Sequence, residues 1–297
     1  MKKTNIVLML FIATSLFFGS CNHREYRTVT IAFDCNCTPQ QQLLAREVIN
    51  NRVGIWGVRN GADLIDGKFD LSFRLRPKDN PYSNPWIYLL EQLLTQRGEI
   101  YITEMFQAHE LASALHSWIS ENPDLSRFLR QASFSGLFTA PTQYISYIDN
   151  ALNLNRHLFP ANVYFAWSAT SGEFTDFYEL LALNSTGQRF PLNTNTVRSV
   201  RIENNIHGFQ QISIFLERNY HAEWARLTRE NIGRSLAFVM DGKVLMHPIV
   251  SDEITGGRLM ISGGNSEIDD LSLIKSVILG GVLECTATII EIPNTYN

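Results

Sequence analysis

The cysteines and histidines are the residues of this 297-residue chain best suited to bind a metal ion or to attack a substrate. Cys35 and Cys37 are separated by one residue, but no second cysteine pair and no histidine cluster completes a tetrahedral zinc set. His109 precedes Glu110, yet the second histidine that a zinc-protease helix places four residues after the first is missing. We therefore expect no metal site and no bound cofactor.

Serine and acidic side chains offer no better case for catalysis. Ser135 and Ser171 each precede a glycine, but neither lies in the Gly-x-Ser-x-Gly turn of hydrolases, and the sequence has no phosphate-binding glycine loop. Several acidic residues could meet in space, but carboxylates on helix and turn surfaces are usually solvated: Glu203, Glu217, Glu223, Glu230 and Asp241. We expect no catalytic residue, so the sequence predicts a protein that is not an enzyme.

Residues 1–20 have the pattern of a signal peptide. Lys2 and Lys3 precede an apolar run over 6–18, which is too short to span a membrane because a spanning helix needs about 20 apolar residues. Gly19 and Ser20 then stand directly before Cys21, an arrangement that resembles the lipobox of bacterial lipoproteins. We expect cleavage before Cys21, lipidation of its thiol, and a location in the cell envelope, lipid-anchored to a membrane on the periplasmic side. The alternative is an ordinary secretory signal that ends near a cysteine.

Charge and cysteine number limit the partners and the covalent links of the exported chain. With 25 basic against 29 acidic residues and no basic tract, no binding to nucleic acid is expected. An exported protein meets an oxidising environment, and Cys35, Cys37 and Cys285 remain besides Cys21. Three thiols allow at most one intramolecular disulfide. Either these cysteines are buried free thiols, or Cys35 or Cys37 is bridged to Cys285.

Hydrophobic periodicity predicts strands and helices in two separate parts of the chain. The first part begins with a strand over 28–33 and a helix that starts at Thr38-Pro39 and runs through Leu43, Leu44 and Val48. A strand over 69–75, a helix from Asn84-Pro85 and a strand over 99–106 follow. The last part has strands over 211–216, 236–240, 244–246, 259–262 and 285–292, and helices over 220–232 and 271–279.

Two details of the last part are specific enough to be checked. Asp241-Gly242 is the two-residue turn that most strongly indicates a tight hairpin. The helix over 220–232 is amphipathic, with Trp224, Leu227 and Ile232 on its inward face. The strands and helices on either side of 107–204 predict the α+β class, with a mixed sheet, helices on one face and an inserted lobe.

Aromatic residues gather within the expected insertion, and we expect most of them to form its core. The alternative is that several line an apolar groove that takes hydrophobic segments of unfolded chains. The candidate polypeptide-binding residues are Phe134, Phe138, Tyr144, Tyr147, Phe159 and Trp167.

A long ordered stretch of the last part resembles the first periplasmic domain of SecD and SecDF, components of the protein-export machinery. The resemblance rests on LTRENIGRSLA over 227–237, on VMDGKVL over 239–245, and on the glycine pairs at 256–257 and 263–264. Upstream, REVINNRVGIWGVR over 46–59 is similar to the family pattern RRRVNALGV. This resemblance implies a ferredoxin-like base, formed by 27–106 and 205–297, that carries an inserted α+β head at 107–204. It also implies that the first and last strands of the base are close, which favours a bridge from Cys35 or Cys37 to Cys285.

The resemblance implies a role in protein export, since the family's head is thought to swing and to hold emerging polypeptide. SecD continues into transmembrane helices that couple proton flow to movement, so this chain is not expected to be a motor by itself. The expected function is that of an envelope lipoprotein that binds exported polypeptide or the Sec machinery and assists translocation. The alternatives are a scaffold lipoprotein with no role in export, and an enzyme or solute binder built on the same fold.

Overall fold

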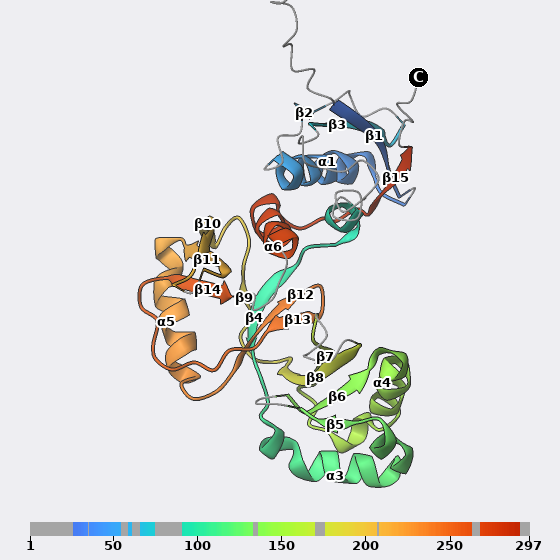
Figure 1. Ribbon diagram of the computed structural model, residues 1–297, viewed down its shortest axis with the longest axis vertical. Coiled ribbons are helices and arrows are strands. Elements are labelled where there is room, and N and C mark those ends of the chain that lie inside the picture. The colour runs from blue at the N-terminus through green and yellow to red at the C-terminus, as the bar shows by residue number, and fades with distance from the viewer. Residues whose placement is uncertain are drawn as a thin grey trace, which may run out of the picture.

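In a computed structural model, the protein is an α+β chain whose described residues form four antiparallel sheets (Figure 1). The structure describes residues 26–34, 36–54, 59–60, 66–74, 91–132, 136–169, 176–206, 208–262 and 268–291. Every ladder between the strands in these ranges is antiparallel. The predicted α+β class is therefore confirmed, but the expected mixed sheet is wrong, because the strands divide among separate sheets.

The two ends of the described chain meet in one sheet with the order β15-β1-β3-β2. Its strands are β1 (Tyr26–Phe33), β2 (Arg59–Asn60), β3 (Lys68–Arg74) and β15 (Ala287–Glu291), and α1 (Pro39–Gly54) lies against it (Figure 1). Val29 and Ile31 alternate along β1 and are fully buried with Ile49 of α1 in one apolar core. This end lobe thus has the period-two pattern of a sheet with one covered face.

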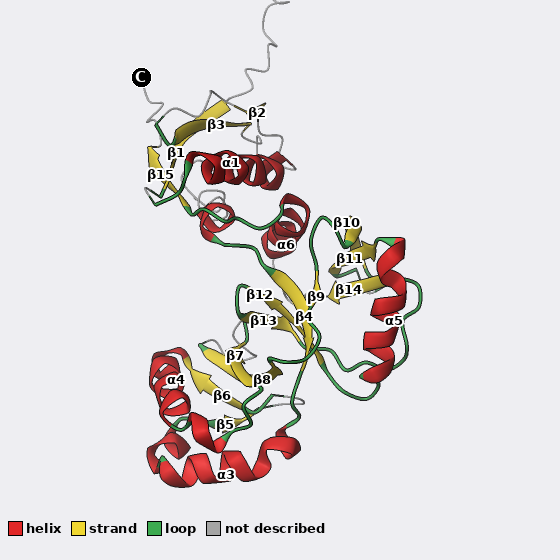
Figure 2. Cartoon of the chain, turned by 180° about the vertical axis from the view of Figure 1, so that it is seen from behind, coloured by secondary structure: helices red, strands yellow, loops and turns green. Residues whose placement is uncertain are grey.

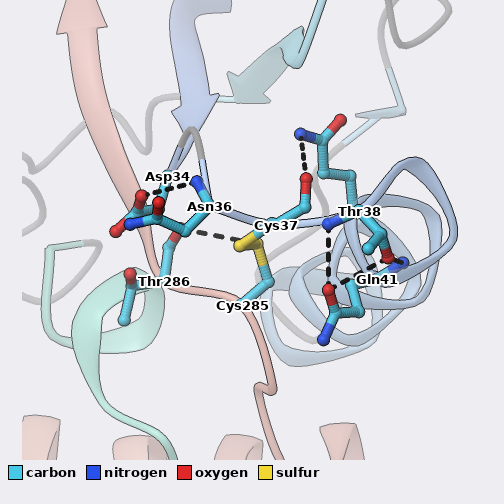
Figure 3. The surroundings of a disulfide bond; sticks show 8 residues. Asp34, Asn36, Cys37, Thr38, Gln41, Cys285 and Thr286 are labelled. Atoms are coloured by element: carbon cyan, nitrogen blue, oxygen red, sulfur yellow. Dashed lines mark hydrogen bonds between the residues drawn. A yellow bond between two sulfur atoms is a disulfide. The ribbon is translucent and has the colours of Figure 1, made fainter.

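A disulfide closes the end lobe. Cys37, two residues before α1, is bonded to Cys285, two residues before β15, with their Cα atoms 6.0 Å apart (Figure 3). Thr38 then begins the helix: its backbone N–H donates to Oε1 of Gln41 over 2.9 Å, and its hydroxyl accepts from the Gln41 backbone N–H over 3.3 Å. Of the pairings left open by the sequence, the structure contains the one with Cys37, and Cys35 lies outside the described residues.

We expect one free thiol among the three cysteines that follow Cys21. A form of the protein that begins after Cys21 should show one reactive thiol when unfolded without reductant, and three after reduction. Replacing Cys285 by serine should lower the free energy of unfolding by about 2–4 kcal/mol, because the unfolded chain loses its cross-link. The matched variant Cys35→Ser should leave the free energy of unfolding unchanged, and three reactive thiols in the oxidised protein would contradict the bridge.

In the described residues, the middle of the molecule contains two sheets and the α-helices α5 (His221–Glu230) and α6 (Ile268–Gly280). One sheet, β10-β11-β14, is made of Val197–Asn204, Gln210–Leu216 and Arg258–Ser262. The other, β13-β12-β4-β9, is made of Lys243–Met246, Leu236–Met240, Ile100–Glu104 and Phe190–Pro191. Helix α5 lies beside the first sheet, and α6 lies between that sheet and α1 (Figures 1 and 2). A single apolar core runs from the end lobe through α6 into these sheets.

The predicted hairpin at Asp241-Gly242 is confirmed, since these residues join β12 to β13 with positive φ angles of 49° and 80°. The carboxylate of Asp241 also accepts hydrogen bonds from the backbone N–H groups of Gly98 and Glu99, over 2.9 and 2.8 Å. Trp224 and Leu227 face the core as expected. The prediction that Ile232 faces inward is wrong, because α5 ends at Glu230 and Ile232 is 50% exposed.

The far end of the molecule from the end lobe is formed by residues 108–184, which we call the distal lobe (Figures 1 and 2). Its sheet has the order β5-β6-β8-β7, with strands Arg130–Gln131, Phe138–Pro141, Phe177–Asn184 and Val163–Trp167. Helices α3 (Ala112–Glu121) and α4 (Ile145–Leu154) and short 3-10 turns pack on it. The distal lobe has a core of its own around the fully buried Trp118.

Candidate functional site

A pocket of ≈ 560 Å³ lies in the distal lobe, where three elements meet. One wall is α4, through residues that include Ile145, Asp149 and Leu152. A second wall is β7 with the residue that follows it, over 163–168, and the third is the turn at Gly242 and Lys243 between β12 and β13. The pocket therefore lies partly on the distal lobe and partly on the central sheet.

The position of α4 follows from its sequence. Ile148, Ala151 and Leu152 recur at three- and four-residue spacing and are buried in the core of the distal lobe. This leaves Asp149 at the edge of the buried stripe, where its Oδ1 accepts a hydrogen bond from Nε1 of Trp167 over 2.8 Å. The indole of Trp167 is thus held in one orientation at the pocket wall by a charge-assisted hydrogen bond.

Arg156 fixes the turn that leads into β7. Its guanidinium donates to the carbonyl oxygens of Pro160 and Ala161, each over 2.9 Å, and of Val163 over 2.8 Å. Three carbonyls that have no place in the sheet ladder are satisfied in this way. Arg156 thereby ties the turn over 160–161 to the first residue of β7 at the pocket wall.

The structure brings one of the six candidate aromatic residues to this pocket, namely Trp167. Phe159 is only 6% exposed, and Phe138 is half-buried beside Trp118, with ring centroids 6.3 Å apart. Tyr144 stacks on Phe128 at 4.3 Å, and Tyr147, which is 47% exposed, meets the same ring edge-on at 5.5 Å. Phe134 and Cys21 lie outside the described residues. Whether any of these residues binds polypeptide stays a prediction.

Within the described residues, isolated strand bridges join the distal lobe to the central sheet at two junctions. At the first, Met105 forms an isolated bridge with Leu183, and the Phe106 N–H donates to the Ala182 carbonyl over 2.9 Å. At the second, Ser168 bridges Val244 in parallel orientation. A small apolar cluster fills the space between the sheets: Tyr101, Met105, Ala166, Leu181, Leu183, Ala237, Val239 and Val244.

A salt bridge reinforces the first junction. Arg234 donates from both terminal nitrogens to the carboxylate of Glu110, over 3.1 and 2.9 Å, and also to the Met105 carbonyl over 3.1 Å. Burial alone would raise the pKa of Glu110, but the hydrogen bonds from Arg234 and from the Gln107 backbone lower the pKa below its ordinary value. The carboxylate is therefore ionised at neutral pH, and the salt bridge is intact there.

Within the residues that the structure describes, no group of three His, Cys, Asp or Glu side chains is arranged to hold a metal ion. No helix among them has the length and apolar character needed to cross a membrane.

The fold of this chain is similar to part of SecDF. A crystal structure of SecDF in a super-membrane-facing form superimposes with a TM-score of 0.51 at 20% identity, covering 96% of this chain and 33% of that chain. Residues 184–279 match the family model described as the SecDF P1 head subdomain. The resemblance to the first periplasmic domain of SecD and SecDF is thereby confirmed.

Named relatives match parts of the chain as well. The protein translocase subunit SecD of Rhodothermus marinus is 28% identical over 138 residues, which are 45% of this chain and 22% of the relative. The protein translocase subunit SecDF of Thermus thermophilus is 34% identical over 85 residues, 29% of this chain and 11% of the relative. The chain thus matches about a fifth and a tenth of the length of these two relatives.

The family model covers only a small part of the pocket wall. The head subdomain model covers residues 184–279, which include Gly242 and Lys243 but neither α4 nor β7. This range also crosses residue 204, where we expected the head to end, so the boundaries of base and head remain a prediction. Most of the pocket wall is therefore contributed by a part of the chain that the family model does not cover.

Proposed function

We propose that the chain is an envelope lipoprotein whose SecD-like domain binds exported polypeptide or the Sec export machinery and assists translocation, without being a motor itself. The observation that carries this proposal is the match of residues 184–279 to the SecDF P1 head subdomain. The relatives are named as translocase subunits, but the chain spans only a part of each. The pocket is the place on the described surface where we expect polypeptide contact, since it is concave and its lining includes apolar and aromatic groups beside polar and charged ones.

The test is binding of a reduced, unfolded secretory polypeptide to the protein that begins after Cys21. We expect saturable binding by fluorescence anisotropy, and a loss of about tenfold or more on replacing Tyr164 by glutamate. Tyr164 lines the pocket and is 43% exposed, so its replacement adds a charge to an apolar surface with little effect on the core.

Phe209→Glu is the matched control, because Phe209 is 56% exposed but lies on the connection between β10 and β11 and not in the pocket. Equal losses in the two variants would indicate non-specific adhesion to exposed aromatics. If the intact protein does not bind the unfolded polypeptide, the polypeptide-binding part of the proposal is wrong, which leaves binding to the Sec machinery or a scaffold role in the envelope.

The lipid anchor is a second part of the proposal. Only residues 22–25 separate Cys21 from β1, and five Cα-to-Cα steps reach at most about 18 Å. A lipid on Cys21 would therefore hold the end lobe close to the membrane and leave the distal lobe, at the opposite end of the molecule, pointing away from it (Figure 2). Labelled palmitate should enter the wild-type protein and not Cys21→Ser, and equal labelling of the two would exclude Cys21 as the site.

A further inference from the structure

One strand of the distal lobe presents its main chain to the pocket. β7 is an edge strand, since the sheet order is β5-β6-β8-β7, and its residues Val163 to Trp167 pair with β8 alone in a regular antiparallel ladder. The pocket is lined by six consecutive residues, 163–168. Side chains of a strand alternate between two faces, so a run of consecutive residues along one wall means that the edge of the strand forms that wall.

The hydrogen bonds of β8 show which residues of β7 point their main chain outward. In an antiparallel pair, residues alternate between those that bond across the ladder and those that face away. Ser168 N–H donates to Glu179 O across the ladder, over 2.8 Å, which places residues 164 and 166 in the bonded set as well. Opposite Phe165 and Trp167, the carbonyls of Ala182 and Leu180 are bonded to Phe106 and Leu137 instead, each over 2.9 Å. Phe165 and Trp167 therefore direct their N–H and C=O groups toward the edge.

The outward main-chain groups at the two ends of β7 are hydrogen-bonded to neighbouring residues, but within the described ranges those in its middle are not. Val163 donates to the Pro160 carbonyl over 3.1 Å and accepts from Arg156, and the parallel bridge of Ser168 with Val244 occupies the carbonyl side of Trp167. The N–H and C=O of Phe165 and the N–H of Trp167 have no partner among the residues that the structure describes. Three main-chain groups at strand spacing thus border the pocket.

The sequence of β7 lacks the usual protection of an edge strand. Natural edges are blunted by charged residues or proline, which prevent another strand from pairing. The other edge strands of five residues or more in the described ranges each carry a charge: Arg198, Arg201 and Glu203 in β10, Arg258 in β14, and Glu291 in β15. β7, with the sequence VYFAW, has neither a charge nor a proline. An unprotected edge beside a pocket is what a strand-pairing site requires.

We propose that β7 binds an extended segment of an unfolded polypeptide as an additional strand, whose main chain pairs with Phe165 and Trp167 and whose side chains enter the pocket. This inference rests on the proposed function and deepens it. Main-chain pairing is independent of side-chain identity, so it suits a site that must accept many exported sequences before they fold. Three hydrogen bonds give a weak and short-lived complex, which lets a moving chain pass on.

A pair of N-methylated peptides separates main-chain pairing from side-chain contact. The probe is a nine-residue peptide of alternating valine and threonine, N-methylated along one edge so that it cannot aggregate but keeps one edge free. The control has the same side chains and is methylated along both edges. Binding to the protein that begins after Cys21 should be at least tenfold weaker for the control, and hydrogen exchange at the amides of Phe165 and Trp167 should slow on adding the probe.

Two variants of the protein test the same edge. Phe165→Pro removes an N–H that points away from β8. The ladder to β8 should stay intact, because an edge strand tolerates proline where the missing N–H faces outward. Phe165→Ala loses the same ring, which packs against Phe159 at 4.9 Å, but keeps the N–H. The proline variant should bind the probe about tenfold more weakly than the alanine variant, and equal binding would overturn the proposal. If the proline variant does not fold, the binding of the two N-methylated peptides to the wild-type protein tests the proposal.

These outcomes differ from a failure of the proposed function. One outcome is that the unfolded secretory polypeptide binds and Tyr164→Glu weakens this binding, but methylation of both peptide edges has no effect. In that case polypeptide binding is supported and strand pairing is wrong. If neither the polypeptide nor the probe binds, both polypeptide binding and strand pairing at β7 are wrong.

Discussion

Replacing Arg52 by alanine should lower the free energy of unfolding by about 4 kcal/mol or more. The side chain of Arg52 is fully buried in the last turn of α1. It donates to the carbonyl oxygens of Leu93, Gln96 and Arg97, over 2.7 to 2.8 Å, and twice to that of Gly281, over 2.7 and 3.1 Å. These carbonyls end the helical turn over 91–95 and α6, and the last carbonyls of a helix have no partner within it. One guanidinium therefore caps two helices. Its loss leaves the carbonyls of Leu93, Gln96 and Gly281 without this donor, whereas the carbonyl of Arg97 keeps a hydrogen bond from the Leu283 N–H over 2.7 Å.

The side chain of Arg52 is closely packed against neighbouring glycines. A Cβ atom on Gly98 would lie 2.2 Å from a terminal nitrogen of the guanidinium, and Gly98 has a φ of 77°. Burial lowers the pKa of Arg52 to about 10, against the field of Asp241, which raises it. The guanidinium is thus charged at neutral pH. Because its folded pKa lies below that of the unfolded chain, its contribution should be constant from about pH 5 to 9 and should change only above pH 10.

Urea unfolding followed by circular dichroism measures this effect. The matched control is Arg127→Ala, since Arg127 is 78% exposed in its ion pair with Asp124 and such pairs contribute less than about 1 kcal/mol. Arg52→Lys should fall between the two, because an ammonium keeps the charge but reaches fewer carbonyls. A loss of less than about 1 kcal/mol in Arg52→Ala would mean that water replaces the guanidinium, and the capping role would be wrong.

Local sequence patterns predicted where helices and strands lie better than they predicted which side chains are buried. The helix that starts at Thr38-Pro39 and runs through Leu43 and Leu44 is present as α1, but these two apolar side chains are 56% and 54% exposed. The buried face instead carries Ala45, Ile49 and Val53, together with Arg52. A charged residue in the buried stripe hides the helical period, and its partners are carbonyls more than forty residues away. No local rule could have identified them.

Strand pairing could not be predicted for a similar reason. Alternation along 163–167 indicates a strand and its two faces, but the neighbours of a strand are fixed by residues far away in the chain. Trp167, one of the candidate aromatic residues, lies at the pocket wall, but Asp149, which orients it, and Lys243, from another sheet, had no signal in the sequence that linked them to it. The edge position of β7 depends on β8 being paired on its other side by β6, which only the complete topology shows.

Replacing Trp118 by alanine should unfold the distal lobe ahead of the rest of the molecule. Trp118 is fully buried at the centre of a core that is separate from the one in the end lobe and central sheets, with Phe138 and Phe159 at ring-centroid distances of 6.3 and 6.2 Å. Truncating a buried tryptophan costs about 3–5 kcal/mol, which is a large part of the stability of a small lobe. Hydrogen exchange should accelerate in α3 and α4 while α1 and α6 keep their protection.

Trp118→Phe is the matched control. The buried Nε1 of Trp118 has no hydrogen-bond acceptor among the described residues, so phenylalanine removes an unpaired donor while keeping most of the apolar volume. We expect a loss below about 1.5 kcal/mol and unchanged polypeptide binding. In Trp118→Ala, binding should be lost together with the protection of α4, because the pocket depends on that helix. Uniform acceleration of exchange through all sheets would instead mean that the junctions at Met105 and Ser168 couple the lobes into one cooperative unit.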